Sequence, residues 1–275
     1  MRSVSGAADW PVEHAAVAVV DSGGTRATHG PQDREFRLAS VTKLLSAYAV
    51  LVAVAEGALE WDQPAGPPGA TVRHLIAHAS GLAFDSAEVQ ADPGTRRIYS
   101  NTGFAVLADT LTDATGITFA DYLNEAVFDP LGMTSSRLTG SAGAGAMSTC
   151  ADLARFAAEL QAPKLLDAAT VAEATGEPAF PGLDGVLPGY GRQRPNDWGL
   201  GFELRDHKDP HWTGQRSSPR TFGHFGQSGT FLWVDPDARL ACVALTDRAF
   251  GPWAIEAWPA FTDAVLAEAA TATPG

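Results

Sequence analysis

The sequence is poor in cysteine, in long apolar segments and in positive charge, and each shortage narrows its possible functions. Its 275 residues include two cysteines, Cys150 and Cys242, whose spacing fits neither a disulfide framework nor a metal site. No segment is long and apolar enough to span a bilayer. The 32 acidic residues outnumber the 19 basic ones, and the net charge of −13 argues against nucleic acid or an anionic membrane as a partner. We therefore expect a small molecule as the binding partner, and neither a metal nor an organic cofactor.

The N-terminal segment lacks the pattern of a secretory signal. The segment from Met1 to Trp10 has no apolar core of the length that a secretory signal needs. On this basis we expect a cytoplasmic protein, and nothing in the sequence indicates an oligomeric state.

Lysine is scarce, with Lys43, Lys164 and Lys208 as the three examples, and Lys43 stands in an unusual place. It belongs to Ser40-Val41-Thr42-Lys43, and the eleven residues that follow are apolar on nearly every side. A helix of this kind runs through the interior and takes the ammonium group with it. Residues at i and i+3 share a helix face, so Ser40 and Lys43 can point into one small volume. Burial lowers a lysine pKa, which predicts a serine nucleophile beside a base. The alternative is a capping serine followed by a surface lysine.

A second motif, Tyr99-Ser100-Asn101, lies between a turn-forming stretch and a helical run. A tyrosinate held beside Lys43 is expected to act as general base on Ser40 and then to protonate the leaving group. Asn101 is expected to bind a substrate carbonyl. The alternative is a half-buried tyrosine and a helix-capping asparagine.

A third motif, His224-Phe225-Gly226, lies where two extended segments flank a glycine-rich stretch. Glycine at a strand edge lets a substrate backbone approach, so Gly226 and His224 are predicted to bind substrate. The N–H of Gln227 is predicted to form an oxyanion hole with the N–H of Ser40.

In this order the three motifs resemble the serine β-lactamase and penicillin-binding-protein superfamily, whose signature is Ser-x-x-Lys, a Ser-x-Asn or Tyr-x-Asn loop, and Lys-Thr-Gly. The Tyr-x-Asn form is similar to the branch of class C β-lactamases, D-alanyl-D-alanine carboxypeptidases and related esterases. The resemblance spans roughly residues 21 to 247. It implies that Ser40 is acylated, that Lys43 and Tyr99 share the proton transfers, that Asn101 orients the substrate, and that His224 replaces the lysine of the third motif.

Two departures from that pattern change the expected substrate. Histidine at 224 makes a fixed positive charge depend on pH. Phe225 replaces a hydroxyl residue that helps to hold the substrate carboxylate in the family, and phenylalanine donates no hydrogen bond. Both changes favour an uncharged ester or small amide over a penicillin.

The remaining cysteines and histidines are interpreted as structural. Cys150 is expected in the first helical turn after a capping Thr149, where a thiol is somewhat reactive. His74 and His78 lack the glutamate of a zinc helix and are expected to be packed and hydrogen-bonded. His207 and His211 lie in a polar loop over 205–219 that is expected to be solvated and that can also border the pocket.

The candidate residues for lining the pocket are Phe84, Tyr190, Trp198, Trp212 and Arg216.

The sequence and the resemblance together predict an α/β (α+β) fold of the β-lactamase type, with an antiparallel sheet flanked by helices. The expected strands lie near 14–21, 198–205, 221–226, 229–235 and 239–247, and the expected helices near 40–56 and 253–270. One domain over 1–275 is expected, with an α/β lobe from about 1–58 and 196–275 and an inserted helical lobe over about 59–195. The site is predicted in the cleft between the lobes.

Together these observations predict a serine hydrolase that works through an acyl-enzyme on Ser40, on a small ester or amide, with weak or no β-lactamase activity. A ligand-binding or acylated sensor protein without turnover is one alternative. A true β-lactamase or D-alanyl-D-alanine carboxypeptidase is another, and transfer of the acyl group to an acceptor other than water is a third.

Overall fold

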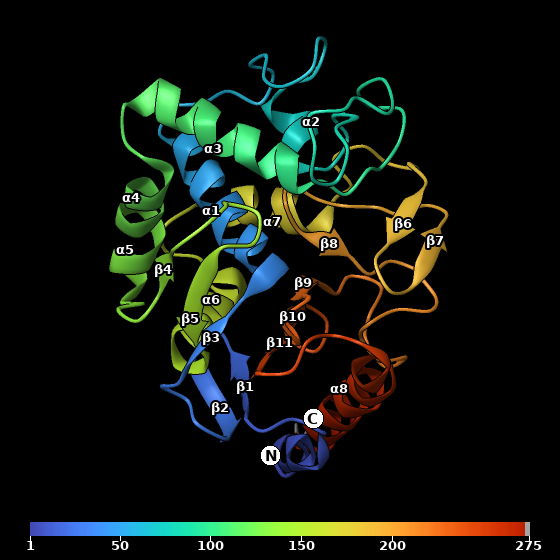
Figure 1. Cartoon of the computed structure of the whole chain (residues 1–275). Helices are drawn as coiled ribbons and strands as arrows, with labels where there is room; N and C mark the ends of the chain where they lie inside the picture. Colours follow the sequence, from blue (N-terminus) through green and yellow to red (C-terminus); the bar gives the residue numbers. More distant parts are fainter. Residues whose placement is uncertain (273–275) are drawn as a thin grey trace.

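A six-stranded antiparallel sheet forms the centre of the protein in the computed structural model, which describes residues 1–272 (Figure 1). The strand order is β2-β1-β11-β10-β9-β8. These strands are β1 (Ala15–Asp21), β2 (Gly24–His29), β8 (Glu203–Leu204), β9 (Phe222–Gly226), β10 (Thr230–Asp235) and β11 (Leu240–Thr246). Residues from both ends of the chain therefore build one sheet, and the predicted α/β fold with helices flanking an antiparallel sheet is confirmed.

The two faces of the sheet are covered by different helices. Val17 and Val19 of β1 pack in one core with residues of α8 (Pro252–Ala272), while Ala16 and Ala18 pack in the other core with α1 (Thr42–Ala55) and α6 (Cys150–Gln161). Because successive side chains of a strand point to opposite faces, an apolar strand such as β1 serves both cores.

The short helix η1 (Ser3–Asp9) lies against α8, so the two ends of the described chain lie side by side (Figure 1). The Glu268 carboxylate accepts hydrogen bonds from the N–H groups of Arg2 and Ser3, at 2.6 and 2.7 Å. These bonds fasten the beginning of the chain to its last helix.

Most of the other helices lie between β2 and β8 in sequence. They are α2 (Val72–Ile76), α3 (Asn101–Thr115), α4 (Phe119–Leu123), η3 (Asn124–Phe128), α5 (Asp129–Leu131) and α7 (Ala168–Gly176). This segment also contributes to a small sheet of β3 (Glu35–Arg37), β5 (Ala146–Thr149) and β4 (Arg137–Leu138), and it forms the hairpin of β6 (Gly185–Leu187) and β7 (Gly191–Gln193). Since β3 pairs with β5, the two lobes expected from the sequence share this small sheet. The division into lobes stays a prediction.

One expected strand is shorter than predicted, and the six strands β2 to β7 of the described residues were not predicted. The strand expected over 198–205 forms over Glu203–Leu204, because Gly201 adopts a left-handed φ of 89° where the chain passes α1. A Cβ at Gly201 would lie 2.2 Å from the Cβ of Ala47, so no larger residue fits there. Strand β2 was not expected, since its polar, largely exposed sequence lacks the apolar alternation of a buried strand.

Among the described residues, no helix combines the length and apolarity that crossing a membrane requires.

Candidate active site

Ser40 lies in a short 3₁₀ turn, η2 (Ala39–Val41), which leads directly into α1. The preceding Ala39 has a φ of 46°, a left-handed conformation that costs a non-glycine residue of the order of 1 kcal/mol or more. The turn is held against the central sheet, where Thr230 Oγ1 donates to Leu38 O at 2.8 Å. This geometry presents a half-buried Ser40 at the N-terminal end of a helix, whose first N–H groups have no acceptor within the helix.

Lys43 is fully buried in α1, as its apolar neighbours predicted. Its Nζ donates to Asn101 Oδ1 at 2.6 Å and to the carbonyl oxygen of Gly143 at 2.8 Å. Burial lowers the pKa of Lys43 from 10.5 to about 7, and the negative charge of Asp85 opposes part of that shift. A substantial fraction of Lys43 is therefore a neutral amine, able to accept a proton, near pH 7.

Tyr99 lies within hydrogen-bonding distance of the serine. Its hydroxyl donates to Ser40 Oγ at 2.7 Å, and its ring lies 4.6 Å from Lys43 Nζ. Burial raises the pKa of Tyr99 above its ordinary value, and the hydrogen bond to Ser40 opposes that shift. The expected tyrosinate is therefore wrong for the free enzyme, in which Tyr99 keeps its proton because the hydroxyl is enclosed.

The backbone that carries Tyr99 is fixed by the start of α3. Ser100 caps this helix by accepting from Gly103 N at 2.9 Å, and its hydroxyl donates to Ala83 O at 2.6 Å. The N–H of Ser100 donates to Nδ1 of the buried His78 at 3.1 Å. These bonds hold the loop that presents Tyr99 on one side and Asn101 on the other.

Asn101 lies beside Lys43, and both polar atoms of its amide group form hydrogen bonds. Its Oδ1 accepts from Lys43, and its Nδ2 donates to Asp85 Oδ1 at 2.8 Å. Asn101 therefore links the buried lysine to an exposed carboxylate. Substrate binding by this amide stays a prediction.

His224 is buried on β9 and lies in the same ring cluster as Tyr99, 5.6 Å between ring centroids. Its Nδ1–H donates to Phe225 O at 2.6 Å. Burial, followed by the charge of Lys43, lowers the pKa of His224 to about 3. The expectation of a charge that varies with pH at this position is therefore wrong in the neutral range, because His224 stays uncharged there.

Gly226 ends β9 next to the turn that carries Ser40, and Gln227 follows it; the two residues have different surroundings. A Cβ at Gly226 would lie 2.3 Å from Leu38 O and 3.2 Å from Ala39 Cβ, so the space beside this glycine is filled by the turn that carries Ser40. Gly226 is absent from the cavity lining, so this structure gives it a packing role where substrate contact was expected. Gln227 is exposed and lines the cavity together with Ser40.

The cavity at Ser40 is small, with a volume of about 50 Å³. Of the five candidate pocket residues, Phe84, Trp198 and Trp212 line it, while Tyr190 and Arg216 do not. Its other lining residues are Ser40, Tyr99, Leu187, Pro188, Glu203, His224, Phe225 and Gln227. The lining is mainly aromatic and apolar.

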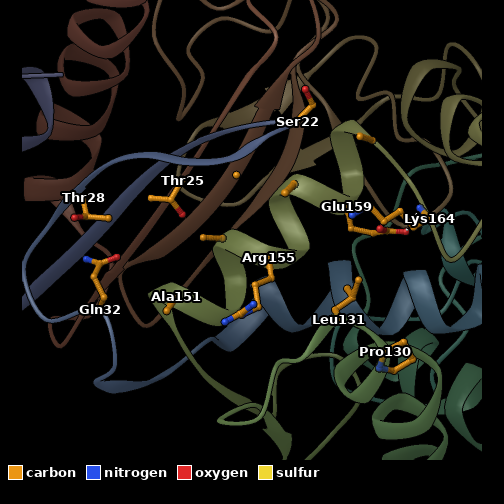
Figure 2. A pocket seen from close by; sticks show the side chains of 14 residues that line it. Ser22, Thr25, Thr28, Gln32, Pro130, Leu131, Ala151, Arg155, Glu159 and Lys164 are labelled. Atoms are coloured by element: carbon orange, nitrogen blue, oxygen red, sulfur yellow. Dashed lines mark hydrogen bonds between the residues drawn. The ribbon is translucent and has the colours of Figure 1, made fainter.

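A larger groove of about 620 Å³ adjoins this cavity and shares Phe84, Tyr99 and Pro188 with it. A separate depression of about 520 Å³ lies between β2 and α6 and contains none of the predicted site residues (Figure 2). There Glu159 accepts from Tyr48 of α1 at 2.7 Å and from the N–H groups of Lys164 and Leu165, both at 2.8 Å. Glu159 therefore fixes α1 to α6 and supports the helix that carries Lys43.

Two groups at the site were missed by the sequence analysis. The Gly143 carbonyl that binds Lys43 lies in a run of small residues over 140–146, and nothing in such a run signals a long-range contact. The second is Glu203, whose carboxylate accepts from Lys208 Nζ and, at 3.0 Å each, from His211 Nε2 and Trp212 Nε1.

Two residues of the loop over 205–219, Lys208 and His211, contact Glu203 in the interior. Only about 4% of His211 and of Lys208 is exposed, so the expectation of a solvated loop is wrong for these two residues. Although burial opposes the shift, the charges of Lys208 and His211 lower the pKa of Glu203 to about 2. The anionic carboxylate holds Trp212 in the cavity wall.

The remaining cysteine and histidine predictions have mixed outcomes. Thr149 caps α6, but Cys150 is fully buried and burial raises its pKa, so the expectation of a reactive thiol is wrong. The packed histidines are confirmed: His74 Nδ1 bonds Thr71 Oγ1 at 2.9 Å, and His78 is buried against Tyr99 and Trp198.

The sheet order and the residues gathered at Ser40 are those of a serine hydrolase with the β-lactamase fold. The chain belongs to the Beta-lactamase family, whose sequence model matches residues 10–265.

Individual relatives agree with this family. The crystal structure of a beta-lactamase from Mycobacterium bovis is 59% identical, with a TM-score of 0.96, and the match covers 97% of this chain and 99% of that one. EstCE1, a hydrolase with promiscuous acyltransferase activity, has the same fold with a TM-score of 0.80 at 18% identity over 96% of each chain. The D-alanyl-D-alanine-carboxypeptidase/endopeptidase AmpH of Escherichia coli is 27% identical over 146 residues, which are 40% of this chain and 38% of AmpH. The match to AmpH thus spans well under half of that protein.

Proposed function

We propose that the protein hydrolyses a small, uncharged ester or amide through an acyl-enzyme on Ser40, with little action on β-lactams. The observation that carries this proposal is the hydrogen bond from Tyr99 to Ser40 Oγ beside a buried lysine whose pKa is near 7. The hydroxyl, the relay and the base that covalent catalysis needs are thus in one place.

In acylation, the Tyr99 hydroxyl turns its proton from Ser40 toward the neutral Lys43 amine and transfers it there. Ser40 Oγ attacks the substrate carbonyl carbon, and its proton passes to the Tyr99 oxygen. The negative oxygen that forms on the substrate accepts from the N–H groups of Ser40 and Gln227. The bond to the leaving oxygen or nitrogen then breaks, and that atom takes the proton back through Tyr99. Acyl-Ser40 and a free alcohol or amine result.

In deacylation, a water molecule attacks the carbonyl carbon of acyl-Ser40 and gives up its proton along the same path. The bond from carbon to Ser40 Oγ breaks, and Ser40 regains its proton. The carboxylic acid leaves, and Lys43 is neutral again.

The preference for an uncharged substrate rests on His224 and Phe225. The first is uncharged at neutral pH and the second donates no side-chain hydrogen bond, so neither can hold a substrate carboxylate. Asn101 is proposed to act through Lys43, whose position it fixes.

A β-lactamase is the second candidate, because the Mycobacterium bovis relative at 59% identity carries that name. A panel of p-nitrophenyl esters, nitrocefin and a fluorophosphonate, followed by turnover and intact mass, separates the two. We expect turnover of short esters with little nitrocefin cleavage. Efficient nitrocefin cleavage would favour the β-lactamase, and a stable adduct without turnover would favour the acylated sensor.

The pH dependence of acylation tests Lys43 as the proton acceptor. Its pKa of about 7 predicts that kcat/KM for p-nitrophenyl acetate rises about tenfold per pH unit below 7 and levels off above it. His224 adds no inflection between pH 5 and 9, because its pKa is about 3. A flat profile over this range, measured under conditions where the fold is intact, would exclude Lys43 as the base.

A further inference from the structure

The groove beside the catalytic cavity differs from the cavity in size and in lining. The cavity at Ser40 has a volume of about 50 Å³, whereas the adjoining groove measures about 620 Å³. Tyr99, Phe84 and Pro188 line both, so the groove continues the cavity along the wall that Tyr99 forms. A substrate bound at Ser40 therefore has room for a small group on one side and for a much larger one on the other.

The groove has an exposed apolar strip. Phe84 is 50% exposed and Val186 is 60% exposed, and both line it, while Val89 precedes the lining residue Gln90 and is 52% exposed. Of the large apolar side chains that the described residues leave exposed, only Ile255 on α8 lies elsewhere. Exposed apolar side chains gathered at one place mark a binding surface.

The groove is also positively charged in a chain with a net charge of −13. Arg96 and Arg192 line it and are exposed. Asp184 is the one acidic residue in the described lining, and it meets Arg192 at 3.1 Å and the neighbouring Arg194 at 3.4 Å. The lining therefore holds two exposed guanidinium groups, those of Arg96 and Arg192, and one carboxylate.

The position of Tyr99 indicates which part of the substrate enters the groove. The group that protonates the leaving atom must lie within hydrogen-bonding reach of that atom, and Tyr99 has this role in the proposed reaction. Residues 95–98, which lead into Tyr99, form one wall of the groove. The oxyanion donor Gln227 lines the small cavity and not the groove. The leaving group therefore departs along the groove, and the acyl group occupies the cavity.

We propose that the groove binds the leaving group of the substrate, and that this leaving group is a large alcohol or amine with an apolar body and an anionic group, joined to a short acyl chain. This inference rests on the proposed acyl-enzyme function. The apolar body lies on Phe84 and Val186, and the anionic group lies near Arg96 and Arg192. The uncharged preference argued from His224 concerns the cavity, and the negative charge belongs to the far end of the leaving group.

Two acetyl esters with the same chromophore test this proposal: acetoxycoumarin-acetic acid, which is anionic, and its methyl ester, which is neutral. In each, Ser40 takes the acetyl group and the coumarin oxygen takes the proton. At low ionic strength we expect kcat/KM to be about fivefold or more higher for the anionic ester, since each exposed charge contact contributes a factor of a few. The ratio should approach one at about 0.5 M salt, because salt screens exposed charges.

The variant R96Q/R192Q should bring the ratio near one at low salt, because it lowers kcat/KM for the anionic ester about fivefold or more relative to the methyl ester. The matched control is R26Q/R220Q, which removes two exposed arginines that lie outside the groove and pair with Asp21 and Asp237. This control should keep the wild-type ratio.

A wild-type ratio of one, or a ratio that R96Q/R192Q leaves unchanged, would overturn the groove assignment while the acyl-enzyme function stands. Absence of an acetyl adduct on Ser40 and of turnover with both esters would overturn both proposals together.

Discussion

Ser40→Ala is expected to abolish fluorophosphonate labelling and to lower ester turnover by about four orders of magnitude or more, because the variant lacks the atom that forms the acyl-enzyme. In the described structure the Tyr99 hydroxyl donates a hydrogen bond to Ser40 Oγ, and Ser40→Ala removes this bond. The fold should be unchanged, since the Ser40 side chain supports no other element. Intact mass after labelling and initial rates with p-nitrophenyl acetate measure the two effects.

Ser86→Ala is the matched control for this experiment. Ser86 lies two residues after Phe84 at the mouth of the site, and its hydroxyl accepts only a weak bond from Glu88 N at 3.4 Å. This variant should keep both the adduct and the turnover. Retained hydrolysis in Ser40→Ala at a rate near that of wild type would show that another group carries the reaction.

Lys43→Met is expected to change activity and stability in opposite directions. Removal of the base should slow acylation by several orders of magnitude. The shift of the Lys43 pKa from 10.5 to about 7 corresponds to a cost of about 5 kcal/mol for the buried charge. Methionine removes this cost and fills the same apolar volume. It also leaves the oxygens of Gly143 and Asn101 without the Lys43 donor, and the loss for the buried Gly143 carbonyl costs about 1–3 kcal/mol. We expect the free energy of unfolding to rise by about 2 kcal/mol at pH 6.

The direction of the pH effect follows from the same pKa. Between about pH 7 and 10.5 the unfolded chain binds a proton on Lys43 that the folded chain does not, so the stability of the wild type rises with pH over this window. The stabilisation of Lys43→Met should therefore be complete below pH 7 and should shrink toward pH 10. Urea unfolding at pH 6 and pH 9 measures it, and equal stability of the two proteins at pH 6 would show that the burial of Lys43 is compensated elsewhere.

The sequence predicted the part of the site that depends on short spacings. Ser40 and Lys43 share one helical face, and the apolar residues after Lys43 allow no solvent-exposed side for the ammonium group. The turn before Tyr99 and the helix after it indicated a fixed loop. The resemblance then related this loop to Ser40, a relation that composition and periodicity do not contain. The central strands β1, β9, β10 and β11 were predicted because each is short, apolar and bounded by turn residues.

Partners that are distant in sequence and small or polar in type could not be predicted. The Gly143 carbonyl is 100 residues from Lys43 and has no side chain that signals its role. Lys208 and His211 lie in a polar loop, and only the three-dimensional structure shows that both contact Glu203 in the interior. Likewise, the environment of Tyr99 and His224 determines their protonation, and that environment is assembled from several segments.

The way the site is assembled has a kinetic consequence. Tyr99 meets Ser40 across 59 residues, Gly143 meets Lys43 across 100, and Thr230 holds the Leu38 carbonyl across 192. Contacts of such sequence separation close large loops and form slowly compared with helices. During refolding, the circular dichroism signal of the helices should therefore return well before ester turnover. The recovery of enzymatic activity then measures the rate of the last step of folding.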